Sequence, residues 1–392
     1  MSELKTSVFS NSLLWFGAGI SIAEILTGML LAPLGFGKGL LAILIGHVIG
    51  GVVMFGAGLI GARTGRSAMG TVEISFGRHG AKLFAGLNVI QLIGWTAVMI
   101  ASAAAAADTL AGMGMSVWSV IIGAFIALWI ILGLKNLGKV NIVVIAALFL
   151  LTLVLSGVIF MGQSVPQAAG DMTIGAAIEL TVAMPLSWLP VISDYTRVAA
   201  KPVKATAASC LAYFVASSWM FIIGMGAALY TGQDDIATIM LQAGMGLIGI
   251  LIVLLSTVTT TFLDAFSAGV SGKSLLPGLS EKALALIACV GGVILAIAVD
   301  ANSFQDFLYF IGSVFAPMTA ILLSDYFILR QDHSHQPVYW TNLILWLAGF
   351  ALYRALLDVQ TPWGITFPVI VFVMLASAVI HKLLPQKHAA GL

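Results

Sequence analysis

The sequence contains very little charge. Of its 392 residues, 8% are charged and 60% are hydrophobic, whereas an ordinary soluble domain is about 25% charged. Water cannot keep so apolar a chain in solution, so a soluble globular protein is excluded. A lipid bilayer accepts it if each crossing is a helix of about 20 apolar residues, because every backbone polar group is then paired inside its own helix.

Features that mark several other protein classes are also missing. The only two cysteines, Cys210 and Cys289, fall inside predicted spans and give neither a disulfide framework nor a metal-site spacing. The N-terminus lacks the small-residue cleavage site of a signal peptide. No His-Glu-x-x-His motif, nucleophile–base set, filter-like loop or nucleic-acid-binding patch is present. We therefore expect neither an enzyme nor a channel, and no nucleic-acid partner.

The apolar runs predict an all-α integral membrane protein with twelve transmembrane helices. The predicted spans cover residues 12–34, 37–62, 80–107, 116–134, 139–162, 174–197, 204–230, 243–267, 283–299, 303–329, 338–356 and 363–384. Fifteen of the seventeen lysines and arginines fall on one side, and only Lys38 and Arg354 fall on the other. Basic loops stay in the cytoplasm, so we expect both termini to be cytoplasmic and the protein to reside in a bacterial inner membrane.

Two spans contain residues that interrupt a helix. The first has glycines and polar residues near its middle, from Gly17 to Glu24. The sixth has two prolines, Pro185 and Pro190, each of which removes a backbone donor. Interrupted spans at corresponding positions of two halves indicate a transporter binding site. The interval of five spans predicts two five-helix repeats of opposite orientation, whose unwound carbonyls are free to bind a cation or a polar ligand.

Polar side chains inside the spans identify candidate ligand groups. Glu24 and Asp264 are the most prominent, because acids inside a membrane are costly and usually functional. Ser256, Thr260 and Asp264 are spaced by four residues and share one face of the eighth span. The alternative is that the hydroxyls only bond to carbonyls of the preceding turn. Glu179 lies near the outer end of its span, where we expect it to reach water.

Aromatic and amide groups suit a flat heterocyclic ligand. Gln91 and Trp95 are four residues apart on the third span, and Ser187 and Trp188 lie in the interrupted sixth span. An indole offers a stacking surface worth about 1–3 kcal/mol per base, while the polar groups can bind the rim of the ring. The alternative for each tryptophan is core packing or an interfacial anchor.

Short segments along most of the chain resemble one transporter family. The most specific are Leu41–Gly46, Gly61–Gly65, Ser75–Gly77, Gln91 with Gly94 and Trp95, Ser187, Asp194–Arg197, Thr259 with Thr260, and Asp325 with Tyr326. Together they resemble the nucleobase–cation–symport family 1, close to the bacterial cytosine permeases.

The resemblance implies a single transporter domain, residues 1–392, with the leucine-transporter-like fold. Two inverted five-helix repeats would occupy 12–162 and 174–329, and two additional helices 338–384. It also implies a secondary symporter that takes up a purine, pyrimidine or related heterocycle with sodium or protons, by alternating access. We expect no cofactor besides the coupling ion, and a monomer surrounded by lipid.

The resemblance also implies where the ligands bind. Sodium would be held by carbonyls near Gly17, Ile20 and Ser21, by the carbonyl of Ser256, and by the hydroxyls of Thr259 and Thr260. The substrate would stack on Trp95, with Ser187 and the glutamine of span three, here Gln91, at its rim.

The chain departs from the cytosine permeases around the substrate. Pro185 replaces an aromatic residue, for which Trp188 is the nearest substitute, and Thr261 follows the threonine pair where the permeases have asparagine. Glu24 and Asp264 are unusual there. A carboxylate can accept two parallel hydrogen bonds from an aminopyrimidine edge in which the amino group adjoins a ring nitrogen able to carry a proton, which favours an amino-substituted pyrimidine. The resemblance includes a subgroup of hydroxymethylpyrimidine (thiamin-precursor) permeases, and we expect this chain to be similar to that subgroup. The alternative is proton coupling through Glu24 or Asp264, since a buried acid titrates at raised pH.

Overall fold

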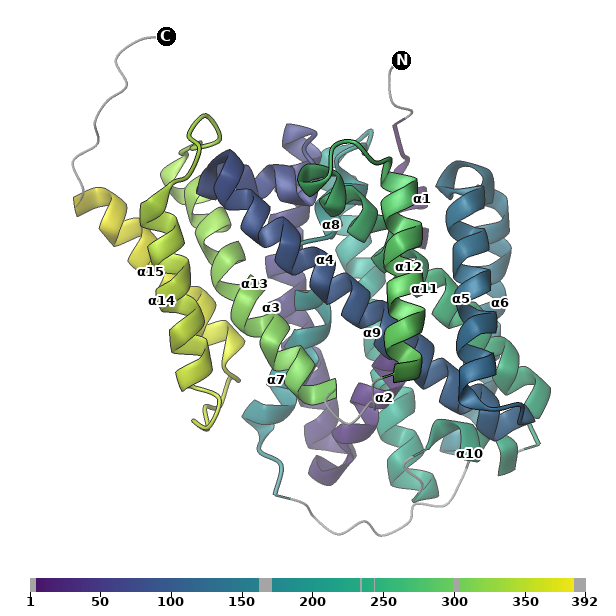
Figure 1. Ribbon diagram of the computed structural model, residues 1–392. Helices are drawn as coiled ribbons and strands as arrows, with labels where there is room; N and C mark the ends of the chain where they lie inside the picture. The colour runs from purple at the N-terminus through teal and green to yellow at the C-terminus, as the bar shows by residue number, and fades with distance from the viewer. Residues whose placement is uncertain (1–4, 162–170, 233–234, 243, 299–303, 384–392) are drawn as a thin grey trace.

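A computed structural model describes residues 5–161, 171–232, 235–242, 244–298 and 304–383 (Figure 1). The predicted span ends at 162, 243, 299, 303 and 384 lie outside these residues. The helices, in chain order, are α1 (Val8–Gly19), α2 (Ile22–Leu30), η1 (Ala32–Leu34), α3 (Gly35–Thr64), α4 (Ala68–Ala111), α5 (Met115–Leu132), α6 (Leu134–Phe160), α7 (Ile174–Ser187), α8 (Ile192–Thr196), α9 (Pro202–Thr231), α10 (Ile236–Gln242), α11 (Gly246–Leu275), α12 (Glu281–Ala298), α13 (Phe304–Leu323), the π-helix η3 (Ser324–Leu329), α14 (Trp340–Ala355) and α15 (Thr366–Leu383).

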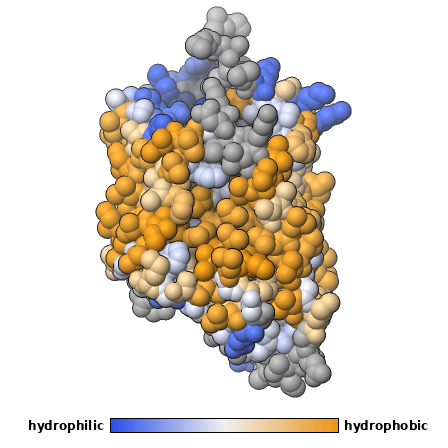
Figure 2. All heavy atoms as spheres, turned by 90° about the vertical axis from the view of Figure 1, so that its right-hand side faces the viewer, coloured by the Kyte–Doolittle hydropathy of each residue, from blue (hydrophilic) through white to orange (hydrophobic). Residues whose placement is uncertain are grey.

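The helices form a membrane-spanning bundle. Among the described residues, ten helical runs are long and apolar enough to cross a bilayer, and the bent pair α1–α2 makes an eleventh. With only 16 residues, α14 is shorter than these, so the twelve predicted crossings are consistent with the structure. Figure 2 shows apolar side chains covering the middle of the molecule between two more hydrophilic ends. The protein is an integral membrane protein.

The two broken helices run in opposite directions (Figure 1). We call the face where α1 begins and α15 ends the terminal face; α10 lies at the opposite face. The pair α1–α2 leads away from the terminal face, whereas α7–α8 leads toward it. This antiparallel arrangement is what inverted repeats require, although the predicted repeat boundaries stay a prediction.

The predicted break in the first span is confirmed. Between α1 and α2, Ile20 and Ser21 leave the helical conformation (Ser21 φ −134°, ψ 155°), and the two halves are bent by 48°. Glycine is a poor helix former and serine a good N-cap. Here the Ser21 hydroxyl accepts a hydrogen bond from the Glu24 N–H at 3.4 Å, which restarts the helix.

The predicted break in the sixth span is also confirmed, but it begins later than its first proline. Helix α7 continues through Pro185 to Ser187, and a turn over Trp188–Val191 separates it from α8. Two amides of α4 bind the carbonyls that this turn exposes. Gln91 Nε2 donates to the Ser187 oxygen at 3.1 Å, and Asn88 Nδ2 donates to the Pro190 oxygen at 3.0 Å.

Two glycines bring α9 into backbone contact with the first broken helix. A Cβ atom at Gly224 would lie 2.0 Å from the Ile25 carbonyl oxygen, and one at Gly28 would lie 2.3 Å from that of Phe221. Small residues allow such close approach between membrane helices. The position of α2 is therefore fixed by α9, which also carries partners of Glu24.

Two segments predicted as loops are helical. The stretch 63–79 contains the first turns of α4, interrupted only by Gly77 at φ 75°. Helix α10 precedes α11, and Asp235 caps it by accepting hydrogen bonds from the N–H groups of Ala237 and Thr238, both at 3.1 Å. An aspartate before an apolar run is an N-cap signal, so this helix was detectable.

The helices α14 and α15 attach to α7 through a buried carboxylate. Glu179 is 2% exposed, which corrects the expectation that it reaches water. It accepts hydrogen bonds from the Tyr353 hydroxyl (2.6 Å), from the N–H groups of Ile365 (2.6 Å) and Thr366 (2.8 Å), and from the Thr366 hydroxyl (2.6 Å). Both of its oxygens are satisfied, so Glu179 is a structural residue.

A loop of residues 330–339 covers the kink of α4 on the terminal face. The Arg78 N–H donates to the Gln336 oxygen at 3.0 Å, and the His333 N–H donates to the Ile74 oxygen at 2.7 Å. The ring of His333 stacks on that of Tyr339, with centroids 3.6 Å apart. Burial, and secondarily the nearby His381, lowers the pKa of His333 to about 4, so this imidazole is neutral at pH 7.

Candidate functional site

The two helix breaks meet at one small cavity. It is about 20 Å³ in volume, which is room for roughly one water molecule, so the surrounding side chains close tightly around it. It lies between α1, α2, α4, α7 and α11. Its lining residues are Ala18, Ser21, Ala23, Glu24, Trp95, Met99, Met184, Ser187, Trp188, Thr260 and Asp264. Five of the seven predicted substrate-binding residues belong to this lining; Gln91 and Thr261 do not.

Glu24 is almost completely buried, at 1% exposure, and only one of its two carboxylate oxygens accepts a hydrogen bond. Its Oε1 accepts a hydrogen bond from the Tyr213 hydroxyl at 2.7 Å, whereas Oε2 has no partner. Ser217 lies beside the carboxyl group and is hydrogen-bonded to His47 Nε2 at 2.5 Å. Burying a polar atom without a partner is costly, so the free oxygen of Glu24 is a candidate ligand atom.

Asp264 enters the cavity from α11. It is 4% exposed, and its carboxylate makes no hydrogen bond to any described residue. Ser256, Thr260, Asp264 and Ser267 are all buried, as predicted for a polar face that avoids lipid. The cavity therefore contains two carboxyl groups from different helices, neither of them neutralised by a basic side chain.

Two indole rings complete the lining. Trp95 packs edge-on against Phe307, with centroids 5.5 Å apart. Trp188 packs edge-on against Trp15 (5.3 Å) and Tyr213 (6.3 Å). These edge contacts fix the two rings that line the cavity, and a preformed aromatic surface suits a planar ligand.

Gln91 occupies a different place from the one predicted. Its amide nitrogen donates hydrogen bonds to Asn88 Oδ1 (2.9 Å) and to the Ser187 carbonyl (3.1 Å). Gln91 therefore stabilises the break of span six and does not line the cavity. Its Oε1 is buried without a partner. The Ser187 hydroxyl, which does line the cavity, donates to the Met184 carbonyl at 2.7 Å. Helical spacing places Gln91 and Trp95 on one face of α4. The Gln91 amide nitrogen is nevertheless hydrogen-bonded to Asn88 and to the Ser187 carbonyl, and Gln91 is not part of the cavity lining.

The predicted cation ligands lie around the break of span one and the facing side of α11. Ser21 and Thr260 line the same cavity, and the Thr260 hydroxyl is buried without a partner. The Gly17 carbonyl accepts the Ile20 N–H at 3.2 Å, which closes the end of α1. No described hydrogen bond occupies the Ile20 carbonyl. Oxygen atoms that lack partners inside a membrane protein are suited to a cation.

The hydroxyls of Ser256, Thr259 and Thr261 differ in whether a protein group already bonds to them. The Thr259 hydroxyl bonds to the Leu255 (2.8 Å) and Ser256 (3.1 Å) carbonyls of its own helix, as the alternative interpretation of the cluster expected. The Ser256 hydroxyl bonds to the Val253 carbonyl at 3.3 Å. The Thr261 hydroxyl is buried without a partner, but it lies outside the cavity.

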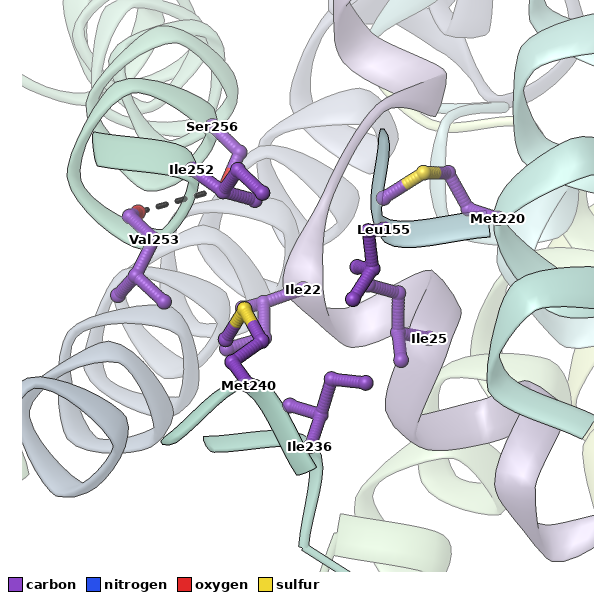
Figure 3. A pocket seen from close by; sticks show the side chains of 9 residues that line it. All are labelled: Ile22, Ile25, Leu155, Met220, Ile236, Met240, Ile252, Val253 and Ser256. Carbon is purple, nitrogen blue, oxygen red and sulfur yellow. Dashed lines mark hydrogen bonds between the residues drawn. The ribbon is translucent and has the colours of Figure 1, made fainter. Parts of the chain in front are cut away.

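An apolar pocket of about 10 Å³ adjoins the break on the side of α10 (Figure 3). Ile22 and Ile25 of α2 point toward Ile236 and Met240 of α10 in this view. Their neighbours Ser21 and Glu24 line the polar cavity. The remaining lining residues of the apolar pocket are Leu155, Met220, Ile252, Val253 and Ser256. An apolar layer thus separates the polar cavity from the face opposite the termini.

Sequence reasoning missed Tyr213 and Trp15. Tyr213 supplies the hydrogen bond to Glu24, and its ring lies edge-on to Trp15 with centroids 6.1 Å apart. Trp15 is fully buried, and its Nε1 has no partner. The one available signal was the position of Trp15, two residues before Gly17; nothing in the local sequence links Tyr213 to Glu24.

Comparison with known proteins decides the family. The sequence model of a family described as permease for cytosine/purines, uracil, thiamine, allantoin matches residues 2–342. The chain belongs to this permease family. The cytosine permease of Escherichia coli K12 is 25% identical over 320 residues, which are 80% of this chain and 75% of the relative.

Solved structures of transporters share the fold of this permease. The nucleobase-cation-symport-1 transporter Mhp1, in a closed conformation with bromovinylhydantoin bound, superposes with a TM-score of 0.82 at 18% identity, over 97% of this chain and 92% of Mhp1. A sodium-coupled sialic acid symporter gives 0.73 at 13% identity, over 96% and 89%. The predicted leucine-transporter-like fold and the predicted family are confirmed: the protein is a permease rather than an enzyme.

Proposed function

We propose that this permease imports an amino-substituted pyrimidine, such as hydroxymethylpyrimidine or cytosine, together with sodium. The observation that carries the proposal is the cavity at the two helix breaks, where Glu24 and Asp264 accompany the indoles of Trp95 and Trp188. A family of permeases for cytosine, purines, uracil, thiamine and allantoin supplies the class of substrate.

The chemistry of the lining favours the amino-pyrimidine. A carboxylate accepts two parallel hydrogen bonds from an aminopyrimidine edge when the ring nitrogen next to the amino group carries a proton. Asp264, whose carboxylate has no described hydrogen bond, is the group proposed to receive this edge. The rings of Trp95 and Trp188 would stack on the heterocycle, and the Ser187 hydroxyl would bind its rim.

Sodium is proposed to bind between the break of span one and α11. The proposed ligands are the carbonyls of Gly17, Ile20, Ser21 and Ser256 and the hydroxyls of Thr259 and Thr260. The Thr260 hydroxyl is the best supported, because it is buried, unpartnered and beside Ser21. Binding there would fix the broken helix and thereby organise the substrate cavity. By reciprocity, sodium and substrate should tighten each other's binding by the same factor.

Transport would follow from alternating access in a monomer of the bacterial inner membrane. The terminal face is assigned to the cytoplasm on the distribution of basic residues. The apolar layer between α2, α10 and α11 would then close the cavity from outside. Rocking of one helix group against the other would open the terminal face. Neither ligand can shift the equilibrium between the two states by more than its differential affinity for them.

Proton coupling is the second candidate, because one observation favours it. Glu24 combines an unpartnered Oε2 with a hydroxyl donor, Tyr213, and a neighbouring Ser217–His47 pair. Such a group could exchange a proton with the cavity and so replace sodium as the driving charge.

The test is uptake of radiolabelled pyrimidines into proteoliposomes of the purified protein. Sodium coupling predicts accumulation driven by an inward sodium gradient at equal pH on both sides, abolished when choline replaces sodium. Competition by unlabelled hydroxymethylpyrimidine and cytosine should exceed that by uracil, which lacks the amino group. Accumulation that follows a pH gradient and ignores sodium would instead establish the proton mechanism. Equal competition by uracil would rule out the proposed role of the carboxylates in substrate choice.

A further inference from the structure

Three metal-ligand side chains meet on the terminal face, outside the transport cavity. They are Asp325 in η3, His333 in the loop 330–339 and His381 in the last turn of α15. One oxygen or ring nitrogen from each lies within 4.8 Å of the other two. Asp325 and His381 are buried, at 0% and 4% exposure. Asp325 and His333 are eight residues apart, His381 follows 48 residues later, and none of the three lines the substrate cavity.

Two of the side chains each have a possible ligand atom without a hydrogen-bond partner among the described residues. Asp325 Oδ1 and His381 Nε2 are both buried without a hydrogen-bond partner. The Ser75 hydroxyl also lies near the Asp325 carboxyl group, but it too has no hydrogen-bond partner. A buried carboxylate oxygen and a buried ring nitrogen without partners are costly unless something binds them.

The opposite side of each ligand is anchored. Asp325 Oδ2 accepts a hydrogen bond from Asn342 Nδ2 at 2.7 Å. His381 Nδ1 donates to the Ser377 carbonyl at 2.8 Å, which leaves the lone pair on Nε2. The ring of His333 stacks on Tyr339 with ring planes 7° apart, and its Nε2 is hydrogen-bonded to Gln331 Oε1 at 3.2 Å, which leaves Nδ1 as the nitrogen for an ion. Metal-binding histidines typically have the second ring nitrogen bound in this way.

We propose that Asp325, His333 and His381 bind one divalent transition metal ion, with Zn²⁺ as the best fit. Two imidazole nitrogens and one carboxylate oxygen suit zinc, which takes such ligands at about 2.0–2.2 Å and fills its fourth position with water. Ligand atoms around tetrahedral zinc are therefore about 3.3 Å apart. Closing the present triangle requires side-chain shifts of about 1 Å. Magnesium and calcium prefer all-oxygen sites and fit poorly.

The ion would have a structural role. It would join α15 and the loop 330–339 to η3, next to the kink of α4. At that kink a Cβ on Gly77 would lie 2.7 Å from the Gln336 oxygen, so the loop is already pressed against α4. Fixing the loop and α15 together should stabilise this end of the bundle without contacting the substrate.

The test uses full-length protein without an affinity tag, purified in detergent and stripped with a chelator. Zinc bound per chain is measured after equilibrium dialysis, and the Tm is measured with Zn²⁺, Mg²⁺ or neither. We expect about one zinc per chain and a Tm raised by Zn²⁺ but not by Mg²⁺. His381→Gln and Asp325→Asn should each weaken zinc binding at least 100-fold. His335→Gln, an exposed histidine of the same loop, is the matched control and should bind as the wild type does.

Cobalt gives an independent readout that needs no variant. Co²⁺ in a four-coordinate nitrogen and oxygen site should produce visible absorption bands that Zn²⁺ displaces. The proposal is overturned if wild-type protein shows no saturable zinc binding and no such bands. It is also overturned if the His381 and Asp325 variants, with an unchanged Tm in chelator, keep wild-type affinity. A variant that does not fold leaves His333→Gln and the wild-type titrations to decide.

Discussion

Glu24 and Glu179 are the same residue type and are almost equally buried, but they differ in how many hydrogen bonds they accept. Both lie on broken transmembrane helices, at 1% and 2% exposure. Glu179 accepts four hydrogen bonds, including two backbone N–H groups at the start of α15. Glu24 accepts one, from Tyr213, and one oxygen stays unpartnered.

The difference separates a structural acid from a candidate functional one. A buried carboxylate whose lone pairs are all bound contributes to the fold and has nothing left for a ligand. A buried carboxylate with a free oxygen imposes a cost on the fold, and it persists only where a ligand or a proton uses it. Asp264 belongs with Glu24 in this comparison, because its carboxylate makes no hydrogen bond to a described residue and it lines the same cavity.

Removing the structural acid should have the largest effect. Glu179→Ala leaves the N–H groups of Ile365 and Thr366 buried without an acceptor, together with one of the Tyr353 and Thr366 hydroxyls, which can pair with each other; the loss costs roughly 3–5 kcal/mol of stability. We expect a lower Tm and yield, with an unchanged KM in the protein that folds. Thermal unfolding and uptake, measured with Glu24→Gln as the counterpart, test this. A large change of KM in Glu179→Ala with a normal Tm would break the comparison.

Asp264→Asn is expected to have the next largest effect, this time on transport. Losing the charged acceptor should lower uptake of amino-pyrimidines about 100-fold, equivalent to about 2.7 kcal/mol. The sodium concentration for half-maximal uptake should stay within a few-fold, since Asp264 is not a proposed sodium ligand. Uptake at varied substrate and sodium measures both quantities. Equal losses of substrate and sodium affinity would contradict the separate roles.

Thr260→Val should have an intermediate effect that is confined to sodium. The substitution keeps the shape and removes a hydroxyl that has no protein partner. We expect the sodium concentration for half-maximal uptake to rise about tenfold, or about 1.4 kcal/mol, with little change in Tm. The matched control is Thr259→Val, whose hydroxyl already bonds within its own helix, and it should shift sodium dependence less. The reverse order would reassign the cation ligand.

Tyr213→Phe should have the smallest effect and sharpen the assignment of Glu24. It removes a single hydrogen bond, worth about 0.6 kcal/mol on average inside membranes, so the Tm should change little. If Glu24 carries the coupling proton, the pH dependence of uptake should shift to higher pH, because the lost donor had stabilised the charged carboxylate. If sodium is the coupling ion, the pH profile of uptake should stay the same, and pH-resolved uptake distinguishes the two.

Some of the site was predictable from local sequence. The interruptions in spans one and six could be predicted, because glycine, serine and proline disfavour a continuous helix at their own positions, independently of their surroundings. The polar face of α11 was also predictable, because helical spacing places Thr260 and Asp264 together. The roles of Gln91 and Glu179 were not, because their partners, the Ser187 carbonyl and the N-terminus of α15, belong to other helices. Helix α10 was predictable from its Asp235 cap and was overlooked.

The sequence by itself determined which segments enter the membrane and where two of them break. A helix can cross the bilayer only if it is long, apolar and hydrogen-bonded along its own backbone. This requirement can be recognised in the sequence of each segment separately. Only the tertiary structure decided which buried polar atoms find partners. Glu24 and Glu179 differ because the Glu24 carboxylate accepts one hydrogen bond, from Tyr213, whereas Tyr353, Ile365 and Thr366 all donate to Glu179.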